Sequence, residues 1–291
     1  MTTGSASVAA LLDRATARLT ATLQLDRREA RLEARVLAAH AWQVTPAWLI
    51  SHDTDVPGIA QAASLDSLLQ RRLGGEPIAY ILGEREFFGL NFAVTRDVLI
   101  PRPDTEVLVE AALQHLPEFT PCRILDLGTG SGAIAITLGL RRPMAEVVAV
   151  EASAEAISIA QANARRLGAD NVHFLTGNWY AGLGKKKFDM IVSNPPYIAA
   201  TDPHLDRGDL RFEPRQALAS GEDGLRDLRI IVSGAPGHLV EHGWLFLEHG
   251  YDQAAAVVEL MRQYDFEQIC TLHDLAGRNR VSGGCRPSKV D

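Results

Sequence analysis

Apolar residues recur at helical spacing through the first quarter of the chain. Two stripes, apolar at every third or fourth position, run through Val8, Leu11, Leu12, Ala15 and Leu19 and then through Leu32, Val36 and Leu37. Thr45-Pro46 is a favourable helix start, because the hydroxyl caps the first turn and proline has the backbone angle of a first helical residue. A later amphipathic stretch ends at Gly74-Gly75, and glycine is common just past a helix. The pattern predicts a small α-helical bundle over residues 1–75, with Trp42 and Trp48 in its core.

Residues 76–100 change to short β-like runs. Phe87, Phe88 and Phe92 lie around Gly89. Aromatic residues that flank a glycine in this way are typical of two short strands joined by a turn. We therefore predict a β-hairpin that links two domains.

The segment that follows the predicted hairpin is stiff. It reads Pro101-Arg102-Pro103-Asp104-Thr105-Glu106, and proline fixes the backbone at two of these positions. A helix is predicted over residues 107–115. The stiff segment is either a rigid wall beside a pocket or a linker that caps this helix, and the local sequence leaves both interpretations open.

After Pro121 the chain alternates between short apolar runs and amphipathic stretches. We predict strands at residues 122–127, 145–150, 172–175, 188–192 and 244–247, and helices that end at Leu140 and cover residues 154–167 and 254–262. Such alternation is typical of an α/β fold in which helices cover both faces of a mostly parallel sheet. Ligands of these folds bind at the carboxyl ends of the strands, near the switch in strand order.

Composition and charge narrow the class of protein. The chain has 291 residues, of which 46% are hydrophobic and 22% charged, as is usual for a globular protein. No run is apolar over the roughly 20 residues that a membrane-spanning helix needs. Three scattered cysteines fit neither a disulfide framework nor a zinc site, and the nine histidines show no metal-ligand spacing. We expect a cytoplasmic protein with no metal site and no membrane partner.

The net charge of −7 bears on the class of substrate. Nucleic-acid binders usually collect basic residues, because neutralising phosphates supplies much of their affinity. The acidic balance therefore favours a substrate other than nucleic acid without excluding one.

A glycine-rich turn follows the first predicted strand of the α/β region. The segment Asp126-Leu127-Gly128-Thr129-Gly130-Ser131-Gly132 closes that strand and opens a helix. Glycine lets backbone amides approach a ligand without a Cβ in the way. Gly128, Gly130 and Ala133 also satisfy the dinucleotide fingerprint, so spacing alone leaves the kind of cofactor open.

Acidic and aromatic residues near this turn discriminate between cofactors. Glu151 ends the second strand, where a carboxylate accepts hydrogen bonds from the ribose hydroxyls of an adenosine. Asp126 favours a cationic ligand such as S-adenosylmethionine over the anionic pyrophosphate of a dinucleotide. Trp179 follows the third strand, where its indole either packs on the adenine or is ordinary core packing, and Asn178 is able to bond the edge of the ring.

The tetrapeptide Asn194-Pro195-Pro196-Tyr197 directly follows the fourth predicted strand. The two prolines stiffen the backbone and leave their carbonyls as fixed acceptors. The Asn194 side chain and the Pro195 carbonyl are placed to hold both hydrogens of a planar NH2 group and to aim its nitrogen at a methyl donor. Alignment of this kind replaces the need for a strong base before transfer.

One further pair of ionisable residues lies at a strand end. Glu248-His249 closes the fifth predicted strand and has the composition of an acid–base pair. A role at the edge of the cofactor site or a structural role is favoured over the acid–base role.

Together these residues resemble those of the peptide chain release factor glutamine methyltransferases, the HemK-type family. The resemblance covers nearly the whole chain and is carried by residues 75–83, 87–89, 100–106, 126–132, 194–197, 211–214, 247–250 and 277–281. The proline-arginine-proline segment joined to Asn-Pro-Pro-Tyr is more specific than either motif alone. Glu151 stands where aspartate is more usual in the family, and Asn178 replaces an acid.

The resemblance implies a seven-stranded class I methyltransferase domain of Rossmann-like fold over residues 101–291. It also implies that residues 1–75 recognise a release factor, that residues 76–100 form a β-hairpin linker, and that the glutamine of a Gly-Gly-Gln motif receives the methyl group. The implied S-adenosylmethionine site comprises Asp126, Gly128, Thr129, Gly130, Ser131, Gly132, Glu151, Trp179 and Asn194. Asn194 and Pro195 are the implied catalytic residues, and Pro196, Tyr197, Leu99 and Arg102 join them in binding substrate.

Two other functions remain as hypotheses. A DNA or RNA methyltransferase acting on the exocyclic amino group of adenine or guanine shares the Asn-Pro-Pro-aromatic motif. Against it stand the acidic balance and the helical N-terminal domain. A non-catalytic cofactor-binding partner is expected to have a damaged glycine turn or Asn194 position, and both are intact here. We expect a monomer that uses class I release factors as protein substrates.

Overall fold

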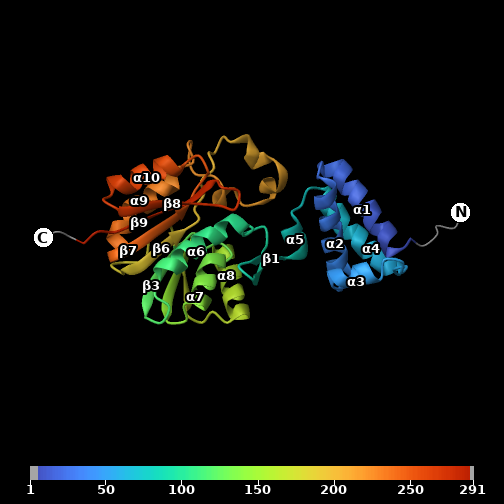
Figure 1. The fold of residues 1–291 in the computed structure, drawn as a ribbon, viewed down its shortest axis with the longest axis horizontal. Helices are drawn as coiled ribbons and strands as arrows, with labels where there is room; N and C mark the ends of the chain where they lie inside the picture. The colour runs from blue at the N-terminus through green and yellow to red at the C-terminus, as the bar shows by residue number, and fades with distance from the viewer. Residues whose placement is uncertain (1–5, 289–291) are drawn as a thin grey trace. The chain divides into compact units, whose positions relative to one another are not determined.

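The computed structural model describes residues 6–288 and divides into two compact units, Met1–Gly83 and Glu84–Asp291 (Figure 1). The division falls within the segment predicted as a linker. The first unit is α-helical, and its elements are α1 (Val8–Leu23), α2 (Arg27–Trp42), α3 (Pro46–Ser51), α4 (Ile59–Leu73) and α5 (Ile78–Leu82).

Capping residues set the limits of the helices in the first unit. The Thr45 side chain accepts a hydrogen bond from the amide of Trp48, at the start of α3, where Pro46 is the first helical residue. Helix α4 ends at Leu73 with Gly74 as its C-cap, in agreement with the predicted stop at Gly74-Gly75. Trp42 is buried, and its indole N–H donates to the carbonyl of Gln61 at 2.7 Å. Trp48 is half-buried, packs against the same core and stacks on His52.

The prediction for the second helical stripe is wrong at its first member. Leu32 is 63% exposed, and the buried face of α2 consists of Ala30, Ala34, Leu37, Ala38 and Trp42. Three of these five are alanines, which allow neighbouring helices to approach closely. A search for large apolar residues at helical spacing therefore includes the exposed Leu32 and overlooks the buried alanines.

The second unit contains a hairpin and a seven-stranded sheet, which confirms the predicted fold class. The hairpin pairs β1 (Glu84–Phe87) with β2 (Leu90–Ala93). The sheet has the order β5-β4-β3-β6-β7-β9-β8, with β9 antiparallel to its two neighbours. Its strands are β3 (Cys122–Leu127), β4 (Ala145–Glu151), β5 (Val172–Thr176), β6 (Phe188–Ser193), β7 (Leu239–Glu248), β8 (Glu267–His273) and β9 (Asn279–Cys285).

Helices cover both faces of this sheet (Figure 1). One core lies between the sheet and α6 (Glu106–His115), α7 (Ala133–Arg141) and α8 (Ala154–Leu167), and the hairpin phenylalanines Phe87 and Phe92 belong to it. The other core lies under α9 (Arg226–His238) and α10 (Ala254–Gln263). Strands β3 and β6 are adjacent at the centre, so the chain segments that follow them lie at the switch in strand order.

One buried asparagine fastens the hairpin to the glycine turn. The Asn163 side chain accepts from the amide of Ala93 at 2.8 Å and donates to the Ala93 carbonyl at 3.0 Å. It also donates to the carbonyl of Ser131 at 2.9 Å. The hairpin is thus tied to the loop that ends β3, and this loop forms part of the site described next.

Candidate active site

The glycine turn is held against the end of the neighbouring strand. The amides of Gly128 and Thr129 both donate to the carbonyl of Val150, at 2.9 and 3.1 Å. Gly132 has φ +84°, and a Cβ there would lie 2.7 Å from Ile136 Cδ1. Only glycine combines this left-handed backbone with the close approach of α7 and α8.

Glu151 braces the same turn. One carboxylate oxygen accepts from the amide of Gly130 at 2.9 Å, and the other accepts from the amides of Ala152 and Ser153 at 2.8 and 3.0 Å. The carboxylate also lines the main cavity of the second unit. Glu151 therefore stands where the sequence predicts a ribose contact, with its position already fixed by three amides.

Asp126 lies behind the turn rather than on the cavity wall. It is fully buried, and it accepts from the Thr129 hydroxyl at 2.6 Å. Burial raises its pKa to about 7, although the Thr129 hydroxyl lowers it. Its second oxygen, Oδ1, has no hydrogen-bond partner within residues 6–288. Thr129 and Ser131 are also buried. Of the predicted glycine-turn residues, Gly128 alone lines the main cavity.

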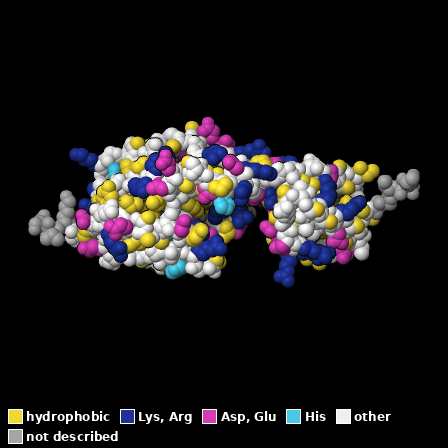
Figure 2. All heavy atoms as spheres, turned by 90° about the horizontal axis from the view of Figure 1, so that it is seen from above, with side chains coloured by type: hydrophobic (Ala, Val, Ile, Leu, Met, Phe, Trp, Pro, Cys, Tyr) yellow, Lys and Arg dark blue, Asp and Glu magenta, His cyan; other side chains and the backbone are white. Residues whose placement is uncertain are grey.

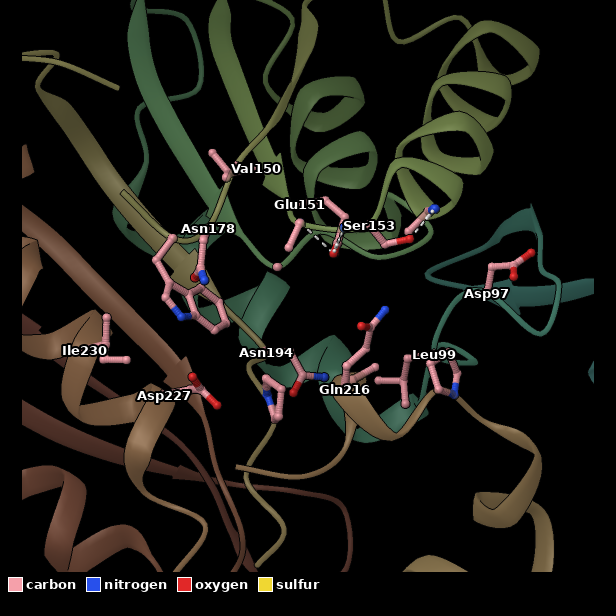
Figure 3. A pocket seen from close by; sticks show the side chains of 18 of the residues that line it. Asp97, Leu99, Val150, Glu151, Ser153, Asn178, Asn194, Gln216, Asp227 and Ile230 are labelled. Carbon is pink, nitrogen blue, oxygen red and sulfur yellow. Dashed lines mark hydrogen bonds between the residues drawn. The ribbon is translucent and has the colours of Figure 1, made fainter. Parts of the chain in front are cut away.

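The main cavity has a volume of about 420 Å³, within the range of small-molecule sites. In Figure 3, Glu151 and Asn178 lie on one side of it, and Asn194, Gln216 and Leu99 lie across from them. Trp179 also lines it, and a Cβ on Gly128 would lie 3.3 Å from the indole ring. The glycine thus lets the indole approach the turn closely. Six predicted residues, Leu99, Gly128, Glu151, Trp179, Asn194 and Pro196, are brought together here.

A smaller cavity of about 70 Å³ adjoins the main one. The two share Leu99, Asn194 and Ala217 as lining residues. The smaller cavity is also lined by predicted substrate residues, namely Arg102, Pro195 and Tyr197. Pro196 lines the main cavity instead. Asn194 therefore stands at the junction, where a group held in one cavity meets a group held in the other.

Hydrogen bonds from three elements fix the tetrapeptide. The Asn194 side-chain NH2 donates to the Thr105 hydroxyl at 3.1 Å, which leaves its Oδ1 available as an acceptor. The Tyr197 hydroxyl donates to Glu248 at 3.2 Å, and its carbonyl accepts from the Gln253 side chain at 2.9 Å. Burial raises the pKa of Tyr197 well above its usual range, so the phenol keeps its proton.

The predicted wall at Leu99 and Arg102 is tied to a buried acid, Glu213. The carboxylate accepts from the amide of Ile100 at 3.0 Å and forms an ion pair with Arg102. Its side chain is fully buried, whereas that of Arg102 is one-third exposed. Of the two interpretations of the proline-rich segment, the structure supports the wall beside a pocket.

Hydrogen bonds within the fold hold the His249 ring away from both cavities. Its Nδ1 donates to the carbonyl of Gly250 and its Nε2 accepts from the Ser282 hydroxyl, both at 2.8 Å. Burial lowers its pKa, so the ring is neutral. It lines neither of the two cavities. Glu248 does line the smaller one, so the Glu248-His249 pair does not act as a unit.

Sequence reasoning assigned no role to several residues that shape the site. These are Thr105, Glu213, Gln216 and Asp227. Thr105 and Glu213 fall inside motifs that carried the family resemblance, and this was the only signal for them. Gln216 and Asp227 carry no local signal, because the three-dimensional path of residues 203–230 alone brings them to the cavity.

Comparison with known proteins gives close relatives over most of the chain. A release factor glutamine methyltransferase from Bordetella pertussis is 53% identical over 87% of this chain and 94% of its own. Another, from Xylella fastidiosa strain Temecula1, is 50% identical over 88% of this chain and 94% of its own. The chain belongs to the release factor glutamine methyltransferase family.

Two domain models agree with membership of this family, and a solved structure supports the fold. Residues 10–83 match the PrmC N-terminal domain, and residues 104–209 match the methyltransferase small domain. A methyltransferase structure from Pyrococcus furiosus covers 77% of this chain and all of its own, with a TM-score of 0.54 and 18% identity, which supports the fold. The chain is an S-adenosylmethionine-dependent methyltransferase. Among residues 6–288, no helix is both long and apolar enough to cross a membrane.

Proposed function

We propose that this chain methylates the side-chain amide nitrogen of the glutamine in the Gly-Gly-Gln motif of class I peptide chain release factors. The names of its relatives state a release factor glutamine as their target. The observation that carries the proposal is the orientation of Asn194. Its NH2 donates one hydrogen bond to Thr105, which fixes the orientation of the amide, and its Oδ1 is an acceptor at the junction of the two cavities.

The main cavity fits S-adenosylmethionine. Glu151 is placed to accept the ribose hydroxyls, Trp179 offers an indole face to the adenine, and Asn178 offers an amide to its edge. Behind the glycine turn lies the buried carboxyl of Asp126. Its Oδ1 has no hydrogen-bond partner within the described chain. When bound, S-adenosylmethionine supplies an electrophilic methyl group on a sulfonium.

The smaller cavity is where the glutamine that receives the methyl group binds. A glutamine amide has two N–H donors in one plane, and the Asn194 Oδ1 and the Pro195 carbonyl are the two acceptors that meet it. Holding both hydrogens in this way aims the remaining face of the nitrogen at the methyl donor. The nitrogen of an amide is a weak nucleophile, so alignment in a near-attack geometry supplies much of the rate. Methyl transfer would leave the cofactor as a neutral thioether, and the methylated nitrogen would then lose one of its two protons to solvent.

Three finer features belong to the same proposal. The helical residues 1–75 recognise the body of the release factor, residues 76–100 connect them to the catalytic residues 101–291, and Leu99 and Arg102 flank the bound glutamine. The chain acts as a monomer in the cytoplasm. The helical unit exposes the apolar side chains Leu32, Ile50, Val56 and Ile59, each of which a protein partner is able to cover.

A competition assay tests the class of substrate. The protein is incubated with radiolabelled S-adenosylmethionine, a purified class I release factor and total cellular RNA or DNA, separately and together. We expect label on the release factor at the same rate with and without nucleic acid. On the face seen in Figure 2, basic side chains are interspersed with acidic ones, as expected for a protein substrate. Label on nucleic acid, with none on the release factor, would favour the exocyclic-amino methyltransferase instead.

A further inference from the structure

Trp179 has an unusual backbone conformation for a bulky residue. Its φ of +50° lies in the left-handed region, which residues other than glycine rarely adopt. The residue stands in a turn that is closed by a hydrogen bond from the amide of Ala181 to the carbonyl of Asn178, at 3.0 Å. A strained conformation of this kind persists only where the surrounding structure holds it. A neighbour of Trp179 should therefore fix the turn.

Tyr180, the next residue in this turn, is anchored on α9. Its hydroxyl donates to the carbonyl of Ile231 at 2.6 Å. Its ring stacks on the ring of His238, with 4.7 Å between the centroids and 7° between the planes. The hydrogen bond holds one end of the side chain and the stacked ring holds its face, so both the position and the rotation of the Tyr180 ring are fixed.

A glycine in α9 makes room for this ring. A Cβ on Gly234 would lie 2.3 Å from Cε2 and 2.5 Å from Cδ2 of Tyr180, far closer than carbon atoms pack. Gly234 lies inside the helix and has no positive φ, so its backbone does not require glycine. Alanine is the better helix former at such a position. The Tyr180 ring therefore accounts for the glycine.

The same face of α9 reaches the main cavity. Ile230 lines that cavity, and Gly234 and His238 follow four and eight residues further along the helix, on the same face. In Figure 3, Ile230 lies on the same side of the cavity as Asn178. One helix thus forms part of the cavity wall and also holds the turn that carries Trp179, which lines the same cavity.

The indole of Trp179 packs against the glycine turn. A Cβ on Gly128 would lie 3.3 Å from Cζ3 and 3.7 Å from Cη2 of the indole. We propose that Tyr180 is a positioning residue of the cofactor site, whose ring, seated at Gly234, holds the turn so that the Trp179 indole presents its face to a planar purine base. This inference rests on the proposed function, because it takes the main cavity as the site of the adenine of S-adenosylmethionine.

Calorimetric titration of the full-length protein with S-adenosylmethionine tests the seat at Gly234. Gly234→Ala places a methyl group where the Tyr180 ring lies, so it should displace the turn. We expect the Kd to rise at least about fivefold, because the loss of stacking on a base costs about 5- to 150-fold in affinity. Gly237→Ala is the matched control, since it is the same change in the same helix and its Cβ meets nothing within 4 Å. Its Kd should stay within about twofold of the wild-type value.

Changes at Tyr180 itself provide a second route to the same result. Tyr180→Phe keeps the ring in its seat and should bind S-adenosylmethionine within about threefold of the wild type, since one neutral hydrogen bond makes a modest net contribution. Tyr180→Ala empties the seat and should weaken binding at least about fivefold. Adding Gly234→Ala to Tyr180→Ala should then weaken binding no further, because the added methyl group has no ring to meet.

A Trp179→Leu background separates positioning from a merely structural role. Trp179→Leu alone should raise the Kd about 5- to 150-fold. In that background Tyr180→Ala and Gly234→Ala should have no further effect on the Kd, because both act through the indole. In Gly234→Ala alone, kcat at saturating S-adenosylmethionine should stay within about twofold, since only cofactor binding is weakened.

Two results would overturn the inference. One is a Gly234→Ala protein with the same Kd as Gly237→Ala, and the other is a weakening by Tyr180→Ala that persists in the Trp179→Leu background. Failure of the proposed adenine contact looks different, because then Trp179→Leu itself binds S-adenosylmethionine with the wild-type Kd. If Trp179→Leu weakens binding and the changes at Tyr180 and Gly234 do not, the positioning role alone is wrong.

Discussion

Asn194 is the side chain on which the two cavities converge, and its usefulness depends on which end of its amide faces them. The donor end is bound to Thr105 at 3.1 Å, so the acceptor end is exposed to the substrate. An oriented acceptor of this kind stabilises charge that develops on the amide hydrogens as the nitrogen attacks. The chemistry of the site therefore depends on one carbonyl oxygen and on the groups that aim it.

Replacing Asn194 with Ala should separate catalysis from cofactor binding. We expect kcat to fall by about 10²–10³, the usual cost of losing one preorganised group that stabilises developing charge. Most of the cavity wall remains, so the Kd for S-adenosylmethionine should change by less than about tenfold. Asn178→Ala is the comparison, because its side chain lies across the same cavity and should weaken cofactor binding more than turnover. Unchanged turnover in Asn194→Ala would refute the role of this residue.

Asp126 should make the stability of the cofactor-free protein depend on pH. Its folded-state pKa of about 7 lies above the ordinary value of 3.8, so the folded protein holds a proton that the unfolded chain has released. The stabilisation by Asp126 is therefore present below about pH 4, is lost as the pH rises to about 7, and is constant above that. Asp126→Asn keeps an acceptor for Thr129 and stays neutral.

Urea unfolding of the wild type and Asp126→Asn at about pH 5 and about pH 8 measures this effect. We expect the variant to gain roughly 1–3 kcal/mol relative to the wild type between these pH values. Parallel curves, with the same difference at both pH values, would show that Asp126 is already ionised in the folded state at pH 5.

At the scale of elements, the ends of β3, β4, β6 and β7 place the functional groups, and the loops between them supply the contacts. Residues 203–217 form three short 3-10 helices, and Glu213 in this segment holds the Leu99–Arg102 wall. Gly224 has φ +75°, and a Cβ there would lie 2.3 Å from the carbonyl oxygen of Tyr197. The chain at Gly224 therefore packs directly against the tetrapeptide and leaves no room for a side chain.

Gly224→Ala should displace the tetrapeptide, and Gly168→Ala provides a matched control. Both glycines have φ +75°, but a Cβ on Gly168 meets nothing within 4 Å. Each substitution should cost about 1–2 kcal/mol from backbone strain alone. Gly224→Ala should in addition lower kcat at least about tenfold, since small displacements of reacting groups are costly. Equal activity in the two variants would contradict the tight packing at Tyr197.

Some elements could be predicted from sequence, and others could not, for identifiable physical reasons. The predicted runs for β3 and α8 match because β3 is a mostly apolar run that is buried at nearly every position and the apolar residues of α8 follow helix periodicity. Strands β8 and β9 gave no such signal. Gly283 in β9 packs against the Phe246 ring, where a Cβ would lie 2.1 Å from it, so burial there depends on the absence of a side chain. Helix α5 has five residues, which is too short for a periodic pattern.

At the scale of the whole molecule, the second unit has two neighbouring cavities along one edge of its sheet. One is for the methyl donor and the other is for the glutamine that receives the methyl group. The strand-end motifs could be predicted to share that edge, because parallel strands bring their carboxyl ends together. The sequence did not indicate that Glu151 would brace the glycine turn or that Asp126 would lie behind it. Those positions depend on hydrogen bonds between segments distant in sequence, which local patterns do not encode.

The measurement that tests the central claim most directly is mass spectrometry of a release factor after reaction. A purified class I release factor is incubated with S-adenosylmethionine and either the wild-type protein or Asn194→Ala, then digested and fragmented. We predict one added methyl group on the glutamine side chain of the Gly-Gly-Gln peptide with the wild type and almost none with the variant. A methyl group on any other residue, or none on this peptide while nucleic acid becomes methylated, would contradict the account.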